Sequence, residues 1–145
     1  MMTIRTISTA LLLFATSLSA QDELVIVSPH WEGVRAEFGR GFKEHYARST
    51  GRQVEYKWLD VGGASDILKF ISKPDAIGVD LFFGGGTDPY VELNKLGLLQ
   101  PYRPPPAIHD GLAATVGGVP LRAGDDAWYA ATMAGFGIIY NKILL

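Results

Sequence analysis

The sequence predicts an α/β protein with a mostly parallel sheet and helices on both faces. Three observations support this fold class. Short apolar runs rich in β-branched and aromatic residues alternate with stretches of helical periodicity between residues 24 and 97. Glycine or proline follows each of these short runs within three residues. Strand–helix–strand units close with right-handed crossovers, which place successive strands parallel in one sheet.

The first twenty residues precede this alternation and contain the three parts of a secretory signal. Arg5 gives a basic start, residues 10–15 form a short apolar core, and residues 18–20 end in a small side chain. The apolar run is shorter than the roughly 20 residues that span a bilayer. We expect residues 1–20 to be a signal peptide and the product to be a soluble, exported protein. The alternative is a buried N-terminal helix.

The first strand is expected over residues 24–27, where a continuous apolar run is typical of a strand buried on both faces. A helix is expected over residues 32–48, because apolar residues recur there every four positions, and Gly51 ends it. Residues 54–59 alternate weakly and indicate a second strand. The apolar stripe of the helix, which we expect to lie in the core, consists of Val34, Phe38 and Phe42.

A second, shorter unit follows. Ser65 is expected to cap a helix that runs to Ile71. Residues 80–83 indicate a third strand, which three consecutive glycines at positions 84–86 terminate. The helix between two strand patterns predicts a further crossover of the same kind.

The last part of the chain is less regular. Asp88 followed by Pro89 predicts a helix start with Asp as the N-cap, and Gly97 closes that helix. Prolines between residues 101 and 106 predict a stiff, irregular connection. Residues 135–140 indicate a final strand.

Composition excludes several classes of function. The 145 residues include no Cys, so the chain offers no disulfide, no thiolate metal site and no thiol nucleophile. Thirteen Lys and Arg against 15 Asp and Glu give a formal net charge of -2, which argues against a nucleic-acid partner. A hydrophobic content of 48% argues against a disordered chain.

Candidate binding residues lie in the three loops that follow the predicted strands. In a parallel sheet these loops meet at the carboxyl edge, and each leads into a helix N-terminus that favours anions. The third loop is the strongest candidate, because glycine permits close backbone approach and Thr87 adds a hydroxyl at the helix start. The nine expected ligand-binding residues are Ser28, His30, Trp31, Gly62, Gly63, Ser65, Gly85, Gly86 and Thr87.

These candidates also have structural interpretations. The glycines could serve only as tight turns, and His30 could be an ordinary loop residue. Trp31 could stack on an organic ligand or cover the sheet. Trp128 and Tyr129 could line the cleft or belong to the core.

The remaining histidines and acidic residues give weaker signals. His45 and His109 are expected to be solvated rather than to act as ligands. Acidic residues near the three loops have no spacing that picks out a base and a nucleophile; these are Asp60, Asp66 and Asp88.

Four segments together resemble a known family: ELVIVSPHWEGVRAEFGRGFKEHYARSTGRQVEY, DVGGASDILKFI, GVDLFFGGGTDPYVELNKLGLLQPY and WYAATMAGFGIIYNK. They are similar to the first lobe of periplasmic solute-binding proteins of ABC importers. Within these proteins, the ferric-iron and polyamine-like branch with a type II periplasmic binding fold is the most similar. The resemblance covers about residues 23–142.

The resemblance implies a two-lobed protein that captures a small solute and delivers it to an ABC permease in the inner membrane. Residues 21–145 would then be an incomplete N-terminal lobe, with the second lobe absent. Two solutes stay open: ferric iron, for which the resemblance implies His30 as a ligand, and a small organic anion. No cofactor is expected beyond iron as the transported ligand, and the protein is expected to be a monomer.

Two other functions stay open. The chain could be a truncated, inert lobe, or it could be an exported phosphate-handling enzyme, because glycine-rich loops also hold phosphate. The GGGTDP loop lacks the Lys of a Walker loop and the spacing of a dinucleotide fingerprint. Neither a G-x-S-x-G elbow nor an H-E-x-x-H motif occurs in the sequence. We therefore expect a binding protein and not an enzyme.

Overall fold

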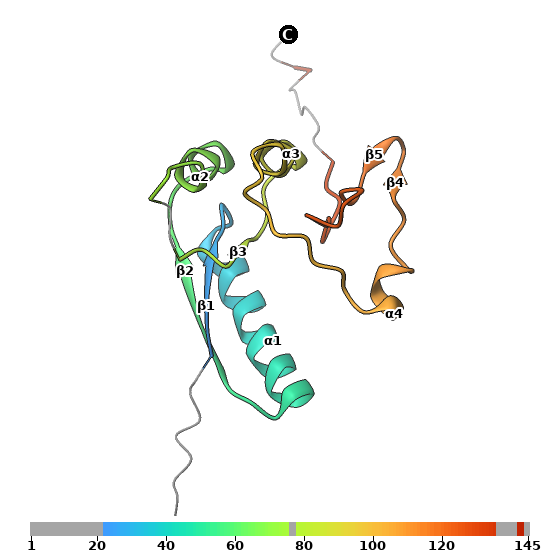
Figure 1. Ribbon diagram of the computed structural model, residues 1–145. Helices are drawn as coiled ribbons and strands as arrows, with labels where there is room; N and C mark the ends of the chain where they lie inside the picture. The colour runs from blue at the N-terminus through green and yellow to red at the C-terminus, as the bar shows by residue number, and fades with distance from the viewer. Residues whose placement is uncertain (1–21, 76–77, 136–141, 144–145) are drawn as a thin grey trace, which may run out of the picture.

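The computed structural model describes residues 22–75, 78–135 and 142–143 (Figure 1). The signal peptide predicted for residues 1–20 lies outside the described residues, as does the strand predicted for residues 135–140 except for its first residue. Among the helices in the described part of the chain, none combines the length and the apolar character that a membrane crossing requires.

Three parallel strands form the central sheet in the order β2-β1-β3. They span Asp22–Val27 (β1), Val54–Leu59 (β2) and Leu81–Phe82 (β3). β1 pairs with β2 along its whole length and with β3 over two residues. Backbone hydrogen bonds from Asp80 and Phe83 to β1 continue the β3 pairing on both sides. The predicted α/β class with a parallel sheet is therefore confirmed.

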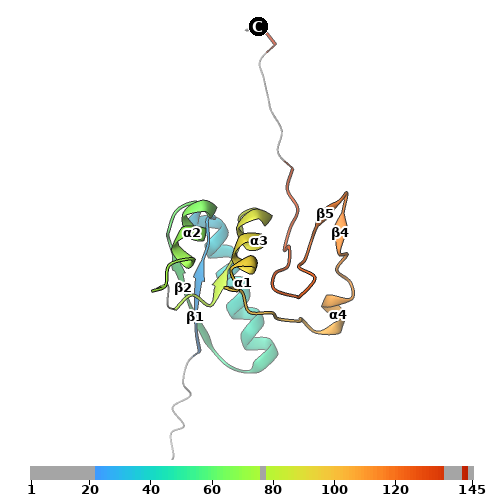
Figure 2. The same cartoon turned by 45° about the horizontal axis from the view of Figure 1, so that its top comes forward.

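Helices cover both faces of this sheet. α1 (Glu32–Thr50) lies on one face, and α2 (Ala64–Ile71) and α3 (Thr87–Lys95) lie side by side on the other (Figure 2). The order β2-β1-β3 explains this arrangement. The chain adds β2 on one side of β1 and then crosses to add β3 on the other side, and right-handed crossovers in opposite directions place their helices on opposite faces.

The main apolar core lies between the sheet and the pair α2 and α3. Its buried members are Val27, Ile67, Phe82 and Leu93. Each fully buried side chain of this kind contributes about 1.5–3 kcal/mol relative to an exposed one. This core therefore fixes α2 and α3, and the loops that precede them, against the strand ends.

α1 packs on the opposite face through close contact and aromatic rings. A Cβ on Gly39 would lie 2.4 Å from Cζ of Tyr56, so the glycine lets the helix approach β2. Trp58 and Phe83 pack with ring centroids 6.3 Å apart, and Nε1 of Trp58 is buried with no hydrogen-bond partner in the described chain. The prediction that Phe38 is core is wrong: 51% of its surface is exposed. Its ring packs against the ring of Phe83, with centroids 4.9 Å apart. Phe83 follows β3, an edge strand of the described sheet, so no further strand covers Phe38 there.

Two predicted helix starts are wrong, whereas the predicted ends are confirmed. α2 begins after Gly63 and not with Ser65 as its cap, and α3 begins after Gly86 and not after Asp88. Both glycines supply the extended backbone that an N-cap requires without using a side chain. Gly51 and Gly97, in contrast, adopt the left-handed conformation at the predicted helix ends.

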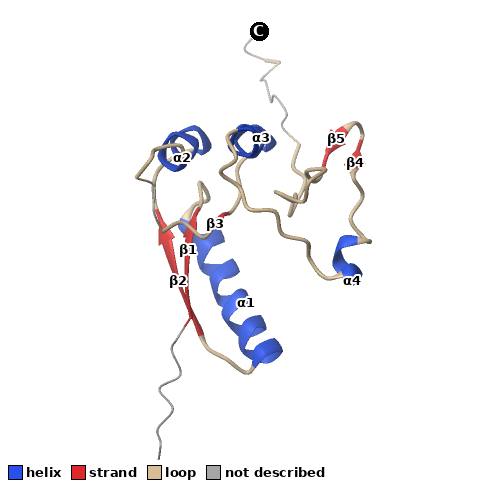
Figure 3. Cartoon of the chain, viewed as in Figure 1, coloured by secondary structure: helices blue, strands red, loops and turns tan. Residues whose placement is uncertain are grey.

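The segment from residue 100 to 135 contains little regular structure (Figure 3). Its proline-rich start leads into the single turn α4 (Pro106–His109). An antiparallel hairpin follows, β4 (Thr115–Val116) and β5 (Val119–Pro120), around two glycines with positive φ. A bridge between Arg122 and Tyr129 closes the next loop.

Candidate functional site

The three loops that follow the parallel strands meet around Gly85. A Cβ on this glycine would lie 3.2 Å from Cβ of Ala64 and 3.7 Å from Cγ of Pro29. Pro29 follows β1, Ala64 begins the helix after β2, and Gly85 itself follows β3. The φ of Gly85 is +84°, a conformation that favours glycine. We call this edge of the sheet the loop rim, defined as residues 28–31, 60–65 and 84–87.

Three helices begin at the loop rim without side-chain caps. Their N-cap residues are Trp31, Gly63 and Gly86, and none of the three makes a side-chain cap hydrogen bond. The first turn of each helix therefore has no side-chain cap acceptor and carries the positive end of the helix dipole, although the N–H groups of Val34 and Asp66 donate to the carbonyls of Trp31 and Gly63.

Acidic side chains in the first turns offset part of this positive potential. They are Glu32 in α1, Asp66 in α2 and Asp88 in α3. Oδ2 of Asp66 accepts a hydrogen bond from the Gly63 N–H at 3.2 Å. The start of α2 is therefore partly neutralised.

His30 links the first loop to the third. Its ring contacts Phe83 at a centroid distance of 5.5 Å, and a Cβ on Gly84 would lie 2.3 Å from its Nε2. The missing side chain at Gly84 is what lets the imidazole cross between the loops. The His30 N–H donates to Oγ of Ser28, which is 1% exposed. Ser28 therefore shapes the loop from inside and positions His30.

Trp31 lies on the outside of the loop rim. It is 72% exposed, and its ring folds back over Gly33, where a Cβ would lie 2.0 Å from Cη2. The interpretation that Trp31 covers the sheet is wrong, because Gly33 lets the ring lie along the start of α1 instead. This places an accessible aromatic face beside a helix N-terminus.

The remaining predicted residues also lie at the rim. Gly62 and Gly63 precede α2, and Ser65 is exposed in its first turn. Thr87 is the first residue of α3 and is half-buried. All nine predicted residues thus fall on three neighbouring loops or the helix starts that follow them.

Tyr90 holds the glycine turn in place, a role that sequence patterns do not reveal. Its single O–H lies within hydrogen-bond distance of two carbonyl oxygens, that of Gly84 at 2.8 Å and that of Phe82 at 3.0 Å, and its proton is shared between them. Its ring stacks on Phe82 with centroids 4.5 Å apart, and burial raises the pKa of its hydroxyl. The third loop is therefore fixed to the end of β3. The ring of Trp128 also packs near Tyr90, with ring centroids 6.4 Å apart.

The described residues include no group of three or more His, Asp or Glu side chains that could hold a metal ion together. His30 is thus the single rim residue with an imidazole available for such a role. One imidazole is a weak site for ferric iron, which prefers several hard oxygen ligands.

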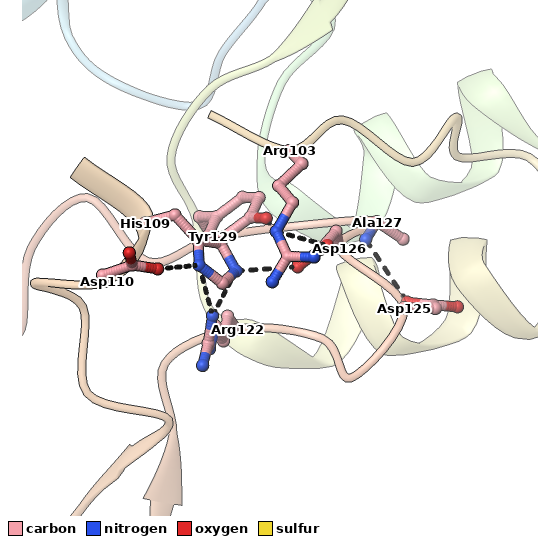
Figure 4. Close-up of polar contacts among 8 residues, drawn as sticks. All are labelled: Arg103, His109, Asp110, Arg122, Asp125, Asp126, Ala127 and Tyr129. Atoms are coloured by element: carbon pink, nitrogen blue, oxygen red, sulfur yellow. Dashed lines mark hydrogen bonds and ion pairs between the residues drawn. The ribbon is translucent and has the colours of Figure 1, made fainter. Parts of the chain in front are cut away.

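A second polar group surrounds His109 (Figure 4). The prediction that His109 is solvated is wrong: it is 5% exposed. Its position at the end of the α4 turn directs the imidazole toward Arg122 and Asp126. The Tyr102 N–H donates to the Asp126 carbonyl at 3.0 Å, which brings these two segments of the chain together. His45 is exposed on α1, as predicted. We call the following residues the His109 cluster: Arg103, His109, Asp110, Arg122, Asp126 and Tyr129.

Asp126 is the common acceptor of this cluster. Its Oδ1 accepts from the Tyr129 hydroxyl at 2.7 Å and contacts Nε2 of His109 at 3.4 Å, and its Oδ2 lies 3.7 Å from Nε of Arg103. The Tyr129 hydrogen bond, followed by the His109 contact and the Arg103 charge, holds the pKa of Asp126 below its usual value. Burial and the Asp126 carboxylate raise the pKa of Tyr129. Asp126 also has a φ of +62°, which is uncommon outside glycine.

Neither the scan against family models nor the search of curated proteins found a match for this chain.

Proposed function

We propose that this chain contributes a lobe to the solute-binding component of an ABC importer, and that its loop rim binds a small organic anion. The observation that carries the proposal is the meeting of three βα loops around Gly85, each followed by a helix without a side-chain cap. Ligands of open parallel sheets bind at this edge. The proposed location is the periplasm, and the proposed partner is an inner-membrane permease.

An organic anion accounts for more rim features than a metal ion does. The positive ends of the three helix dipoles, with the N–H groups of the first helical residues, favour a negative group. The exposed ring of Trp31 offers a face for the organic part, and Thr87 adds a hydroxyl donor at the start of α3. Ferric iron is the second candidate, and the feature that favours it is the position of His30 across Gly84.

Titration calorimetry on the full chain tests the solute class. The probes are methylphosphonate and methanesulfonate as organic anions, spermidine as a cation, and ferric citrate. We expect the anions to bind and spermidine not to bind. Binding of ferric citrate that is lost in His30→Ala, without binding of the other anions, would support iron instead. Turnover of any probe would contradict the proposal of a binding protein.

Two substitutions locate the site. Thr87→Ala should weaken anion binding by about tenfold, the usual effect of removing a hydrogen bond to a charged group. Thr115→Ala, on the exposed hairpin, makes the same chemical change away from the rim and should leave affinity unchanged. Equal affinities in the two variants would remove the loop rim from consideration.

Asp66→Asn tests the electrostatic part of the proposal. The amide keeps an oxygen that can accept from the Gly63 N–H but removes a negative charge from the start of α2. Anion affinity should therefore rise severalfold, and the rise should shrink in high salt. A fall in affinity would indicate that the solute is not anionic.

A further inference from the structure

A hollow of about 260 Å³ lies beside the His109 cluster. None of its lining residues belongs to the loop rim. The charged part of its lining consists of Arg103, Arg122 and Asp126, with the imidazole of His109 beside them. Two guanidinium groups therefore face this hollow with a single carboxylate.

Arg122 is the unusual member of this lining. It is half-buried, and its Nη1 contacts both ring nitrogens of His109, the Nε2 contact being the closer one. Within the described part of the chain it makes no ion pair with a carboxylate, and the carboxylate of the hollow, Asp126, is paired with Arg103 and accepts from Tyr129. A partly desolvated cation without a countercharge is unfavourable.

The contact with His109 does not supply that countercharge. A guanidinium only donates, so Nε2 of His109, the ring nitrogen closer to Arg122, must act as the acceptor. In that neutral tautomer the ring proton lies on Nδ1, which donates to Oδ1 of Asp110 at 3.1 Å, and Nε2 does not donate to Asp126. A neutral ring satisfies one N–H of Arg122 but leaves its charge uncompensated. The other guanidinium nitrogens of Arg122 make no hydrogen bond or ion pair with the residues that the structure describes, and Arg122 lines the hollow.

We propose that the hollow between Arg103 and Arg122 binds a small oxyanion, a carboxylate or phosphate group, with Arg122 as its main contact. The planar fork of a guanidinium matches two oxygens of either group. A volume of about 260 Å³ accepts a group of a few heavy atoms. Gly124 lines the same hollow without a side chain to fill it. This site is independent of the solute proposed for the loop rim.

NMR of the histidine rings tests binding directly. The full chain is titrated with sodium malonate or sodium phosphate at constant ionic strength. The signals of His109 should shift and saturate with either probe or with one of them, whereas those of His45, exposed on α1, should stay in place. Saturation by malonate alone identifies a carboxylate, and saturation by phosphate alone identifies a phosphate. Equal, unsaturated drift of both histidines would overturn the proposal.

Calorimetry with the same probes assigns the contacts. Arg122→Gln should weaken binding about tenfold or more, whereas Arg40→Gln on the exposed surface of α1 removes the same charge and should have no effect. Arg103→Gln, whose side chain is 68% exposed, should weaken binding severalfold and keeps the test valid if Arg122→Gln unfolds. Equal effects of the Arg122 and Arg40 changes would refute the site.

Discussion

The two parts of the described chain differ in what lies buried inside them. In residues 22–99 the buried side chains of the core are apolar and come from three strands and two helices. In residues 100–135 the buried residues are Ala123 and His109, and hydrogen bonds and ion pairs connect the elements. The first part depends on apolar surface removed from water, and the second on a polar network.

This difference explains what each part can do. A regular apolar core positions the three loops of the rim at one edge of a sheet. The polar network instead leaves charged groups partly exposed around a hollow, because the apolar side chains in its lining are limited to Ala114 and Ala123. Substitutions that act on one part and not on the other test whether the two are separate units of stability.

The largest effect is expected from Leu93→Ala, which opens a cavity in the apolar core. Leu93 is 0% exposed, so its truncation should lower the free energy of unfolding by about 2–5 kcal/mol. Urea denaturation measures the change. Leu96→Ala, on a side chain that is 59% exposed at the end of the same helix, is the control and should cost far less. Similar costs at both positions would contradict the apolar-core description of residues 22–99.

The next effect is expected from His109→Ala, which removes the centre of the polar network. The substitution should lower the free energy of unfolding by about 1–3 kcal/mol, because it leaves the polar partners of the imidazole without a hydrogen bond. Hydrogen exchange should accelerate in residues 103–130 and stay unchanged in residues 22–99. His45→Ala on α1 is the matched control. Acceleration across the whole chain would show that the two parts unfold as one.

Tyr90→Phe should have a smaller effect, because it removes one oxygen and keeps the stacked ring. The carbonyls of Phe82 and Gly84 lose a donor, which should cost about 1 kcal/mol. Amide signals of residues 84–87 should move in NMR spectra, whereas those of residues 106–126 should not. Unmoved signals at the glycine turn would show that Tyr90 does not fix it.

The smallest effect is expected from pH. The folded-state pKa of Asp126 is lowered, so its contribution to stability is complete above the unfolded pKa near 4 and is lost as pH falls through the folded value. The pKa of Tyr129 is raised, so its contribution is complete below about pH 10 and is lost as pH rises further.

Asp126→Asn isolates the acid part of this behaviour. The amide keeps the tolerance for positive φ but cannot lose a charge, so acid should no longer loosen residues 103–130 selectively. Hydrogen exchange between pH 3 and pH 6 measures this, with the exposed Asp75→Asn as control. An unchanged acid response in Asp126→Asn would assign the effect to another group.

Sequence patterns predict the regular part of the fold, in which strands and helices alternate. Apolar runs and four-residue spacing locate the strands and helices of residues 22–99, and parallel topology then brings the three loops together. The starts of α2 and α3 are each misplaced by two residues, because Gly63 and Gly86 cap through their backbone and leave no polar side chain as a signal.

The His109 cluster could not be predicted in the same way. His109 and Asp126 are 17 residues apart, and their contact depends on how the loop between them folds back. No periodic pattern marks such a pair. Tyr90 is similar, since its spacing identifies a core position but not the carbonyl groups that its hydroxyl reaches. The signal peptide and the importer family stay predictions.

The exposure of Trp31 provides an optical sensor for the loop rim. The chain has three tryptophans, and the other two are shielded, Trp58 against Phe83 and Trp128 against Tyr90. Excitation of the tryptophans therefore yields a red-shifted emission component from Trp31, which water-soluble quenchers such as iodide reach first. A molecule that settles on the rim changes that component while the shielded emission acts as an internal reference, so occupancy can be followed without attaching a dye.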